Sequence, residues 1–206
     1  MMGGLLTTAL VAVVVLATLP VRVPFYSGWG PLVLILAEFA LVWCLTSRLR
    51  ANAIASGEEK ALLLVYAASL GAVLVPALAA AAGAVLPALL AGSGMFGAAG
   101  VWGYVTHSDM RPLGTALFMG VVGLFIALIG NGLLAHAALS FRISAAGVLL
   151  FSGLTAYDIR RIGASAHRRI GVYGGGGAAI LGALALYLDF LNLFLLALQF
   201  MTGRRR

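Results

Sequence analysis

Long apolar stretches alternate with short polar links along the chain. No Asp, Glu, Lys or Arg occurs from Ala61 to Ser108, or from Pro112 to Phe141. A helix needs about 20 apolar residues to cross the hydrocarbon core of a bilayer. The first charge-free run is therefore long enough for two crossings and the second for one. This pattern predicts an integral membrane protein that crosses the bilayer several times.

Seven apolar segments can be placed on this pattern. Their lengths fit helices, whereas a membrane barrel would show alternating strands of about ten residues. A proline, Pro76, is expected to kink the third segment, and a tight turn near Ala82–Gly83 separates the third from the fourth. The sequence predicts an all-α fold in one transmembrane domain, with spans at about residues 5–19, 29–46, 61–80, 87–104, 113–134, 140–162 and 178–201.

Composition agrees with this class and changes how the net charge is interpreted. Only 9% of the 206 residues are charged, against about 25% in an average soluble domain. The net charge of +7 would suggest a nucleic-acid partner in a soluble protein. Here the basic residues stand in short links between apolar runs, where they face lipid headgroups and set the orientation of the chain. We therefore expect the lipid bilayer as a partner and no nucleic acid.

The basic residues also predict the orientation. With seven spans, eight of them fall on the side of the N-terminus and five on the other side, and such an excess favours a cytoplasmic N-terminus. The first group is Arg48, Arg50, Lys60, Arg111, Arg160, Arg161, Arg168 and Arg169, and the second is Arg22, Arg142 and Arg204–Arg206. A re-entrant last segment would move the three terminal arginines to the N-terminal side, but its length favours a full span.

Three acidic residues lie inside predicted spans, namely Glu38, Asp158 and Asp189. A charge at the centre of a spanning helix costs about 2.5–3.5 kcal/mol on insertion scales, so each such residue suggests a function. Asp158 stands near the end of the sixth span and Asp189 well inside the seventh. The stretch between them is long enough to turn the chain around, so the two carboxylates can meet between antiparallel helices.

A pair of carboxylates at this place would form a coupled site. Two of them at hydrogen-bond distance cannot both ionise cheaply, so the pair would share a proton and sense pH. A nearby arginine, Arg48 or Arg50, would compete for the ionised state as a latch. Calcium also prefers carboxylate oxygens, which makes Asp158 and Asp189 candidate calcium ligands. The structural alternative pairs Asp158 with Arg161 and leaves Asp189 hydrogen-bonded for packing.

Small residues recur every three positions in the fourth span, at Gly94, Gly97, Gly100 and Gly103. Such a stripe lets another helix approach closely, and we interpret it as a packing face. Asn131 and Asn192 are interpreted as hydrogen-bond partners between helices.

Three ordered stretches of the second half carry a resemblance to a known family. They are Gly103-Tyr-Val-Thr-His-Ser-Asp109 with Leu113-Gly114, Phe151-Ser-Gly-Leu-Thr-Ala-Tyr-Asp158 with Ile162, and Ala185-Leu-Tyr-Leu-Asp-Phe-Leu-Asn-Leu-Phe194. In residues 87–200 the chain resembles the Bax inhibitor-1 (transmembrane Bax inhibitor motif) family. It departs from that pattern at His107-Ser108, where the family usually has a basic pair.

The resemblance implies a seven-helix fold with the last helix central, in a bacterial inner membrane. Bacterial members are similar to pH-sensitive calcium leak channels. Carried over, Asp158 and Asp189 become the pH-sensing and ion-gating pair, with Arg48 or Arg50 as the latch. Glu38 becomes a pore-lining carboxylate or, alternatively, a buried acid held neutral. Calcium and protons are then the expected ions, and no cofactor is expected.

Two other functions stay open at this point. The resemblance also allows a non-conducting regulator that binds a protease or a cell-death or stress protein, and paired acids also serve proton-coupled transporters. An enzyme is not expected. Ser165 and His167 lie in a predicted polar link, no HExxH motif occurs, and Cys44 has no evident activating base.

Overall fold

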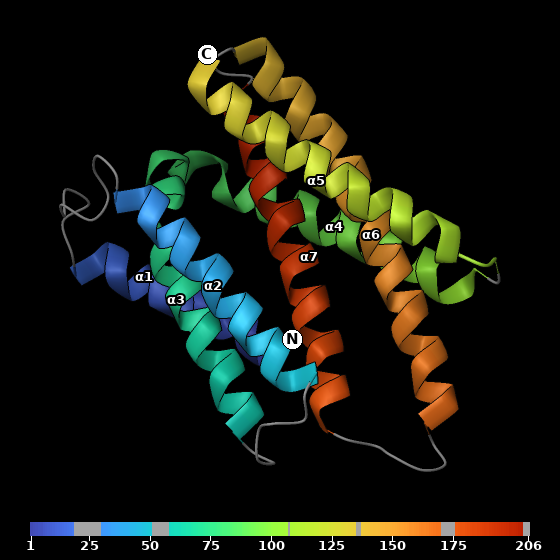
Figure 1. Ribbon diagram of the computed structural model, residues 1–206. Coiled ribbons are helices and arrows are strands. Elements are labelled where there is room, and N and C mark those ends of the chain that lie inside the picture. Colours follow the sequence, from blue (N-terminus) through green and yellow to red (C-terminus); the bar gives the residue numbers. More distant parts are fainter. Residues whose placement is uncertain (19–29, 51–57, 107, 135–136, 170–175, 204–206) are drawn as a thin grey trace. The chain divides into compact units, whose positions relative to one another are not determined.

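The computed structural model describes residues 1–18, 30–50, 58–106, 108–134, 137–169 and 176–203. Within these ranges the chain forms seven α-helices and one short 3-10 turn (Figure 1). They are α1 (Met2–Thr18), α2 (Gly30–Arg50), α3 (Glu58–Ala80), η2 (Ala82–Ala84), α4 (Val85–Val105), α5 (Arg111–Leu134), α6 (Ala137–Arg169) and α7 (Gly176–Gly203).

Each predicted apolar segment corresponds to one of these helices, and the all-α prediction is confirmed for the described residues. The largest difference is at the end of α6, which continues to Arg169 instead of ending near residue 162. Ser165 and His167 therefore belong to a helix, and their placement in a link was wrong. The predicted turn near Ala82–Gly83 is η2, and α3 continues through Pro76 to Ala80.

Five of the described helical stretches are long and apolar enough to cross a membrane. They are Lys60–Ala80, Ala82–Val105, Pro112–Asn131, Ala138–Ala164 and Ala179–Thr202, and the apolar part of α1, Met2–Val15, is shorter. The protein is thus an integral membrane protein with several apolar helices. Seven full crossings remain a prediction, because α1 and α2 are not among the five.

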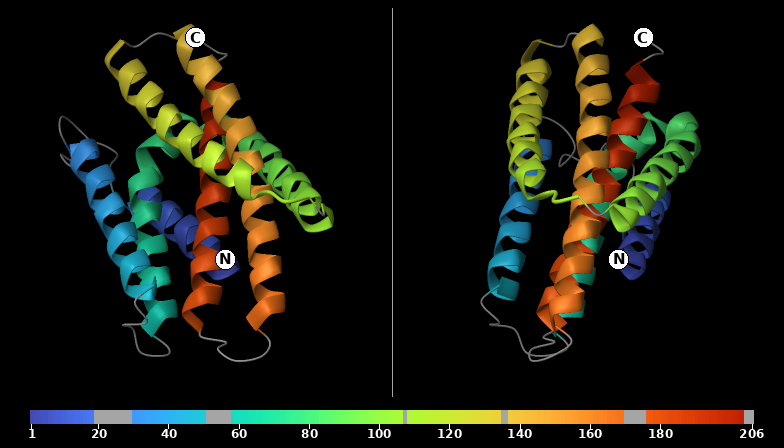
Figure 2. Two further views of the ribbon diagram at one scale, coloured as in Figure 1. Left: turned by 45° about the vertical axis from the view of Figure 1, so that its right-hand side comes forward. Right: turned by 90° about the vertical axis from the view of Figure 1, so that its right-hand side faces the viewer.

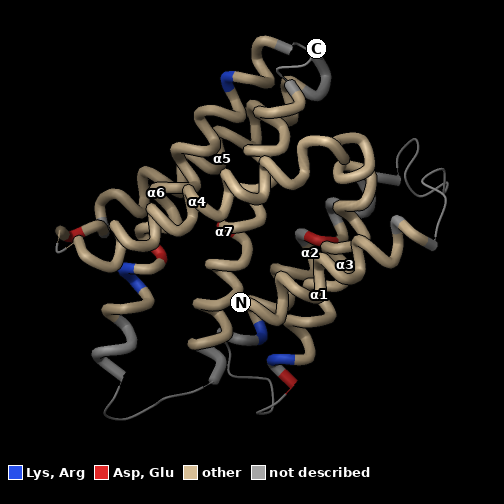
Figure 3. The backbone as a smooth tube through the Cα atoms, turned by 180° about the vertical axis from the view of Figure 1, so that it is seen from behind, with Lys and Arg blue, Asp and Glu red and all other residues tan. Residues whose placement is uncertain are grey.

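Charged residues stand mostly near helix ends (Figure 3). Long uncharged stretches lie between them, as the charge-free runs of the sequence require, and the acids Glu38 and Asp189 lie inside helices. Arg22 and Arg204–Arg206, which entered the prediction of orientation, lie outside the described residues.

The helices divide into two compact units, and α7 contributes to both. The first unit contains residues 1–82 and 173–187, and thus α1, α2, α3 and the beginning of α7. Its tightest contact joins α1 to α3, where the backbone of Thr8 occupies the place that a side chain on Gly71 would need. Leu184 and Tyr187 of α7 are buried in this unit. A single transmembrane domain stays a prediction.

The second unit contains residues 83–172 and 188–206. In it α5 lies alongside α6, and α4 crosses α6 at an angle (Figure 2). A hydrophobic cluster joins α5, α6 and α7; it consists of Leu124, Ile143, Phe151, Leu193 and Leu196. At one end of this unit the ring of Phe141 stacks on that of Phe200, with 4.6 Å between centroids.

The five candidate spans differ in how much of them is covered by protein. In the Ala179–Thr202 span of α7 44% is buried, whereas in the Pro112–Asn131 span of α5 only 6% is. Large apolar side chains of α5 are accordingly exposed, as expected of a surface that faces lipid tails; they include Phe118, Met119, Ile126 and Ile129. A central position of the last helix stays a prediction, which the heavier burial of α7 favours.

Candidate functional site

Asp158 on α6 directly follows two residues that pack against glycines of neighbouring helices. Gly103, near the end of α4, lies directly against the backbone of Ala156. Gly114, in the first turn of α5, lies under the ring of Tyr157, whose Cζ would be 2.5 Å from a Cβ at that position. A larger residue at either glycine would displace α6 next to Asp158. The motif glycines therefore serve to position this part of α6.

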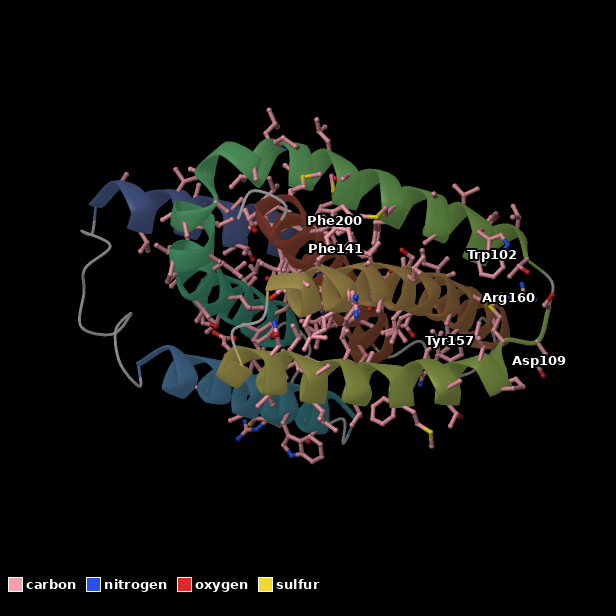
Figure 4. The ribbon with its side chains drawn as sticks, turned by 90° about the horizontal axis from the view of Figure 1, so that it is seen from above. Trp102, Asp109, Phe141, Tyr157, Arg160 and Phe200 are labelled. Atoms are coloured by element: carbon pink, nitrogen blue, oxygen red, sulfur yellow. The ribbon has the colours of Figure 1, made fainter. Side chains whose placement is uncertain are left out.

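Residues typical of a membrane surface lie at the same end of the second unit as Asp158. Trp102, 53% exposed, lies with Asp109 and Arg160 at the same end of the second unit (Figure 4). Tyr104 is also exposed there. Tryptophan, tyrosine and arginine gather at the headgroup level of membranes. Asp158, two residues before Arg160, thus stands close to one end of the membrane-spanning part of α6.

Asp189 lies in the interior of α7 and is almost completely buried, with 3% of its surface exposed. Its Oδ2 is buried and has no hydrogen-bond partner within the described residues. An ionised carboxylate has room for about four hydrogen bonds, so a buried oxygen without any of them is costly.

The second unit brings the two predicted aspartates into one electrostatic neighbourhood. Asp158 acts on the buried carboxyl of Asp189 across the α6–α7 contact. Asp158 also interacts with Arg161, one turn further along α6. Arg161, the alternative partner that the sequence suggested for Asp158, thus acts on it electrostatically, as Asp158 does on Asp189.

The other predicted site residues lie in the first unit. Glu38 is in the middle of α2, half-buried, and is hydrogen-bonded to Ser69 of α3. Arg48 is exposed on the last turn of α2. Arg50 ends the same helix, and its side chain lies outside the described part. A latch formed by either arginine stays a prediction.

The sequence did not single out a buried hydroxyl cluster in the first unit. Oγ1 of Thr8 on α1 lies 2.6 Å from the hydroxyl of Tyr187 on α7 and 2.8 Å from the carbonyl oxygen of Ala67 on α3. The rings of Tyr66 and Tyr187 meet edge to face, with centroids 6.3 Å apart. Threonine and tyrosine are common in membrane helices, so only their meeting in space reveals the cluster.

Among the described residues, the glycine stripe of α4 packs against another helix only at its C-terminal end. Gly100 lies against Ile159 and Gly103 against Ala156, whereas a Cβ added to Gly94 or Gly97 would meet no atom within 4 Å among the described residues. For the first half of the stripe the packing face stays a prediction, because α4 leaves α6 as the two helices cross. Asn131, in contrast, joins α5 to α6 as expected, through a 2.6 Å hydrogen bond to Ser140.

Metal ligands are sparse in the described part of the chain. No group of three or more His, Cys, Asp or Glu side chains there is arranged to hold a metal ion. Calcium usually takes 6–8 oxygen ligands, and the two aspartates would supply only some of them.

Comparison with known proteins identifies the family. The family model described as inhibitor of apoptosis-promoting Bax1 matches residues 1–206. The chain belongs to this Bax inhibitor-1-like family. It is 34% identical to the inner membrane protein YbhL of Escherichia coli K12, over 98% of this chain and 87% of YbhL.

Other bacterial relatives agree with this assignment. A protein of Deinococcus radiodurans is 37% identical over 83% of this chain and 74% of its own length. A protein of Borreliella burgdorferi is 33% identical over 88% of this chain and 78% of its own length. The family resemblance predicted from the motifs is thus confirmed, and it extends over the first third of the chain, where no motif was recognised.

Proposed function

We propose that this Bax inhibitor-1-like protein is a pH-sensitive leak for calcium across the bacterial inner membrane, gated by Asp158 and Asp189. The observation that carries the proposal is the buried carboxyl of Asp189, with one oxygen lacking any described partner and a second carboxylate acting on it. Such a pair is expensive to keep doubly ionised inside a membrane. Its charge therefore changes with pH by binding or releasing protons.

The gate follows from competition for this charge. A proton, a cation in transit and an arginine all stabilise the pair, and only one of them satisfies it at a time. Arg161 acts on Asp158 in the present arrangement, and Arg48 or Arg50 is the proposed latch. Glu38 would line the route of the ion when it is ionised. No catalytic role is proposed for any of these residues.

Calcium flux into proteoliposomes tests this proposal directly. Flux through the parent protein is expected to depend on pH, and this dependence is expected to disappear in Asp158→Asn and in Asp189→Asn. Both changes remove a titrating group but keep nearly the same shape. Glu58→Gln is the matched control, because Glu58 is an exposed acid in the first turn of α3.

The outcomes of this experiment test the sensor role of the aspartates and the conduction of calcium separately. If both aspartate variants keep the parent's pH dependence, the aspartates are not the sensor. If flux never exceeds that of protein-free liposomes, the chain is not a leak at all. Counterflow of a labelled substrate would instead indicate a proton-coupled transporter.

A second candidate function is a non-conducting regulator that binds another membrane protein. It is favoured by the open half of the α4 stripe, where Gly94 and Gly97 face no other described part of the chain. Small residues on an apolar helix allow the backbone of a partner helix to approach closely. Absence of flux, together with loss of a crosslinked partner in Gly97→Leu, would support this function over the leak.

The proposed function includes a location in the inner membrane and an orientation of the chain within it. YbhL, which covers nearly the whole chain, is named an inner membrane protein, and the excess of basic residues favours an N-terminus in the cytoplasm.

A further inference from the structure

A second group of polar side chains lies within the first unit, apart from the aspartates. It combines one acid, Glu38 of α2, with hydroxyl groups of three other helices. Thr8, Tyr66 and Tyr187 are buried, with 5%, 4% and 0% of their surfaces exposed. Ser69 of α3 is hydrogen-bonded to Glu38, the phenols of Tyr66 and Tyr187 interact with Glu38 electrostatically, and Thr8 joins the group through its bond to Tyr187.

Counting hydrogens shows how few of these groups are available to donate to Glu38. The hydroxyl of Thr8 has one hydrogen, and two carbonyl oxygens lie within its reach, that of Gly4 at 3.0 Å and that of Ala67 at 2.8 Å. Carbonyls only accept, so Thr8 donates to one of them. Tyr187 is then the donor in the 2.6 Å bond to Thr8, and its hydrogen is not available to Glu38.

Ser69 is limited in the same way. Its hydroxyl lies 2.8 Å from the carbonyl oxygen of Tyr66 and is also hydrogen-bonded to the carboxyl of Glu38. When the single hydrogen of Ser69 is on the Tyr66 carbonyl, the hydrogen between Ser69 and Glu38 has to come from Glu38. A neutral Glu38 then satisfies the remaining contact of the Ser69 hydroxyl, whose oxygen accepts the Glu38 hydrogen.

The second oxygen of Glu38 points to the same state. Oε2 is buried and has no hydrogen-bond partner in the described part of the first unit. The titratable groups that face Glu38 are the phenols of Tyr66 and Tyr187, and no lysine or arginine acts on it among the described residues. An ionised carboxylate in an apolar helix needs a cation or several donors, and among the described side chains Ser69 is the hydrogen-bond partner found for Glu38.

We propose that Glu38 is a second proton-binding site, which carries a proton in the resting protein and donates it to Ser69. The ligand of this site is the proton itself. A neutral Glu38 does not attract calcium, so it contributes charge to an ion route only after it has released its proton. The site thus goes beyond the aspartate pair and does not depend on it.

Infrared spectroscopy of the reconstituted protein tests this site without any measurement of flux. A neutral carboxyl group gives a carbonyl stretching band that shifts in heavy water, and an ionised one does not give it. At neutral pH we expect this band in the parent and its loss in Glu38→Gln. The side-chain amide of that variant keeps a donor for Ser69, so folding is expected to be retained, as the amide I band checks.

Three further variants assign the band. The double variant Asp158→Asn with Asp189→Asn is expected to keep the carbonyl band of Glu38. Ser69→Ala is expected to shift the frequency of this band, because the hydrogen bond is lost. Glu58→Gln is expected to leave the band unchanged. A parent spectrum that equals that of Glu38→Gln overturns the proposal, because Glu38 is then ionised. A band lost only in the aspartate double variant also overturns it, and places the proton on the aspartates.

Discussion

At the scale of single residues, the polar side chains inside the helices differ in how they are satisfied. Thr155 and Ser144 donate to carbonyls of the preceding helical turn and need nothing else. Asp189 and Glu38 each keep a buried oxygen without a described partner. In a membrane water does not compensate such groups, so these two acids are the ones proposed to bind a proton or an ion. Oδ1 of Asn131 is also buried without a described partner, but an amide carries no charge.

The bond between Thr8 and Tyr187 offers a test at this scale. Buried hydrogen bonds between membrane helices contribute about 0.6 kcal/mol on average and up to about 1.7 kcal/mol. We expect a coupling free energy in this range between Thr8→Ala and Tyr187→Phe, measured as a double-mutant cycle of unfolding in detergent.

Thr7 provides the matched control for this cycle. Its hydroxyl bonds to the carbonyl of Gly3 in its own helix. Thr7→Ala should therefore show no coupling to Tyr187→Phe. Equal coupling for Thr7 and Thr8 would mean that the contact between Thr8 and Tyr187 carries no specific free energy.

At the scale of elements, glycines decide where helices meet. Gly71 lets α1 approach α3, and Gly103 and Gly114 let α4 and α5 approach α6 just before Asp158. Membrane helices gain little from the hydrophobic effect against each other, so close packing through small residues is a main source of their association. The positions of the aspartates thus depend on residues that carry no chemistry.

Two glycines of the same helix make this dependence measurable. Gly103→Ala places a Cβ against the backbone of Ala156, whereas Gly94→Ala places one in open space. Overpacking of this kind typically costs about 1–3 kcal/mol, so Gly103→Ala is expected to lower the thermal unfolding midpoint. Gly94→Ala is expected to leave it unchanged or raise it slightly, because alanine is the better helix former by up to about 1 kcal/mol. Equal losses in both variants would refute the packing argument.

At the scale of the whole molecule, the length of α7 bears on the orientation of the chain. Its 28 residues extend for about 42 Å at 1.5 Å per residue, more than the hydrocarbon core of about 30 Å. A full last span places the two termini on opposite sides of the membrane, and a re-entrant last segment places both on one side.

Reporter fusions distinguish these two topologies. A reporter that is active only in the cytoplasm is expected to work at the N-terminus and to fail at the C-terminus. A reporter that needs export is expected to give the reverse result. Cytoplasmic activity at both ends would require a re-entrant α7 or an even number of spans.

The hydrophobic pattern alone determined most of the fold. Charge-free runs predicted the membrane class and the helices, since backbone groups in lipid must be bonded within their own segment. The end of α6 was missed because arginines are compatible with a helix that leaves the membrane, so polarity at Arg160 and Arg161 marked the membrane boundary rather than the end of the helix.

For the site, too, one part follows from the sequence and another part from the tertiary structure. The sequence by itself determined that Asp158, Asp189 and Glu38 are costly charges within apolar helices, because the cost follows from residue type and depth alone. Only the tertiary structure decided which groups interact with them: Asp158 acts on Asp189, Arg161 acts on Asp158, Ser69 is hydrogen-bonded to Glu38, and two tyrosines interact with Glu38 electrostatically. The reason is that partners come from different helices, and the rotation and crossing of helices depend on close contacts, such as that of Gly103 with Ala156, that no periodicity in one segment encodes.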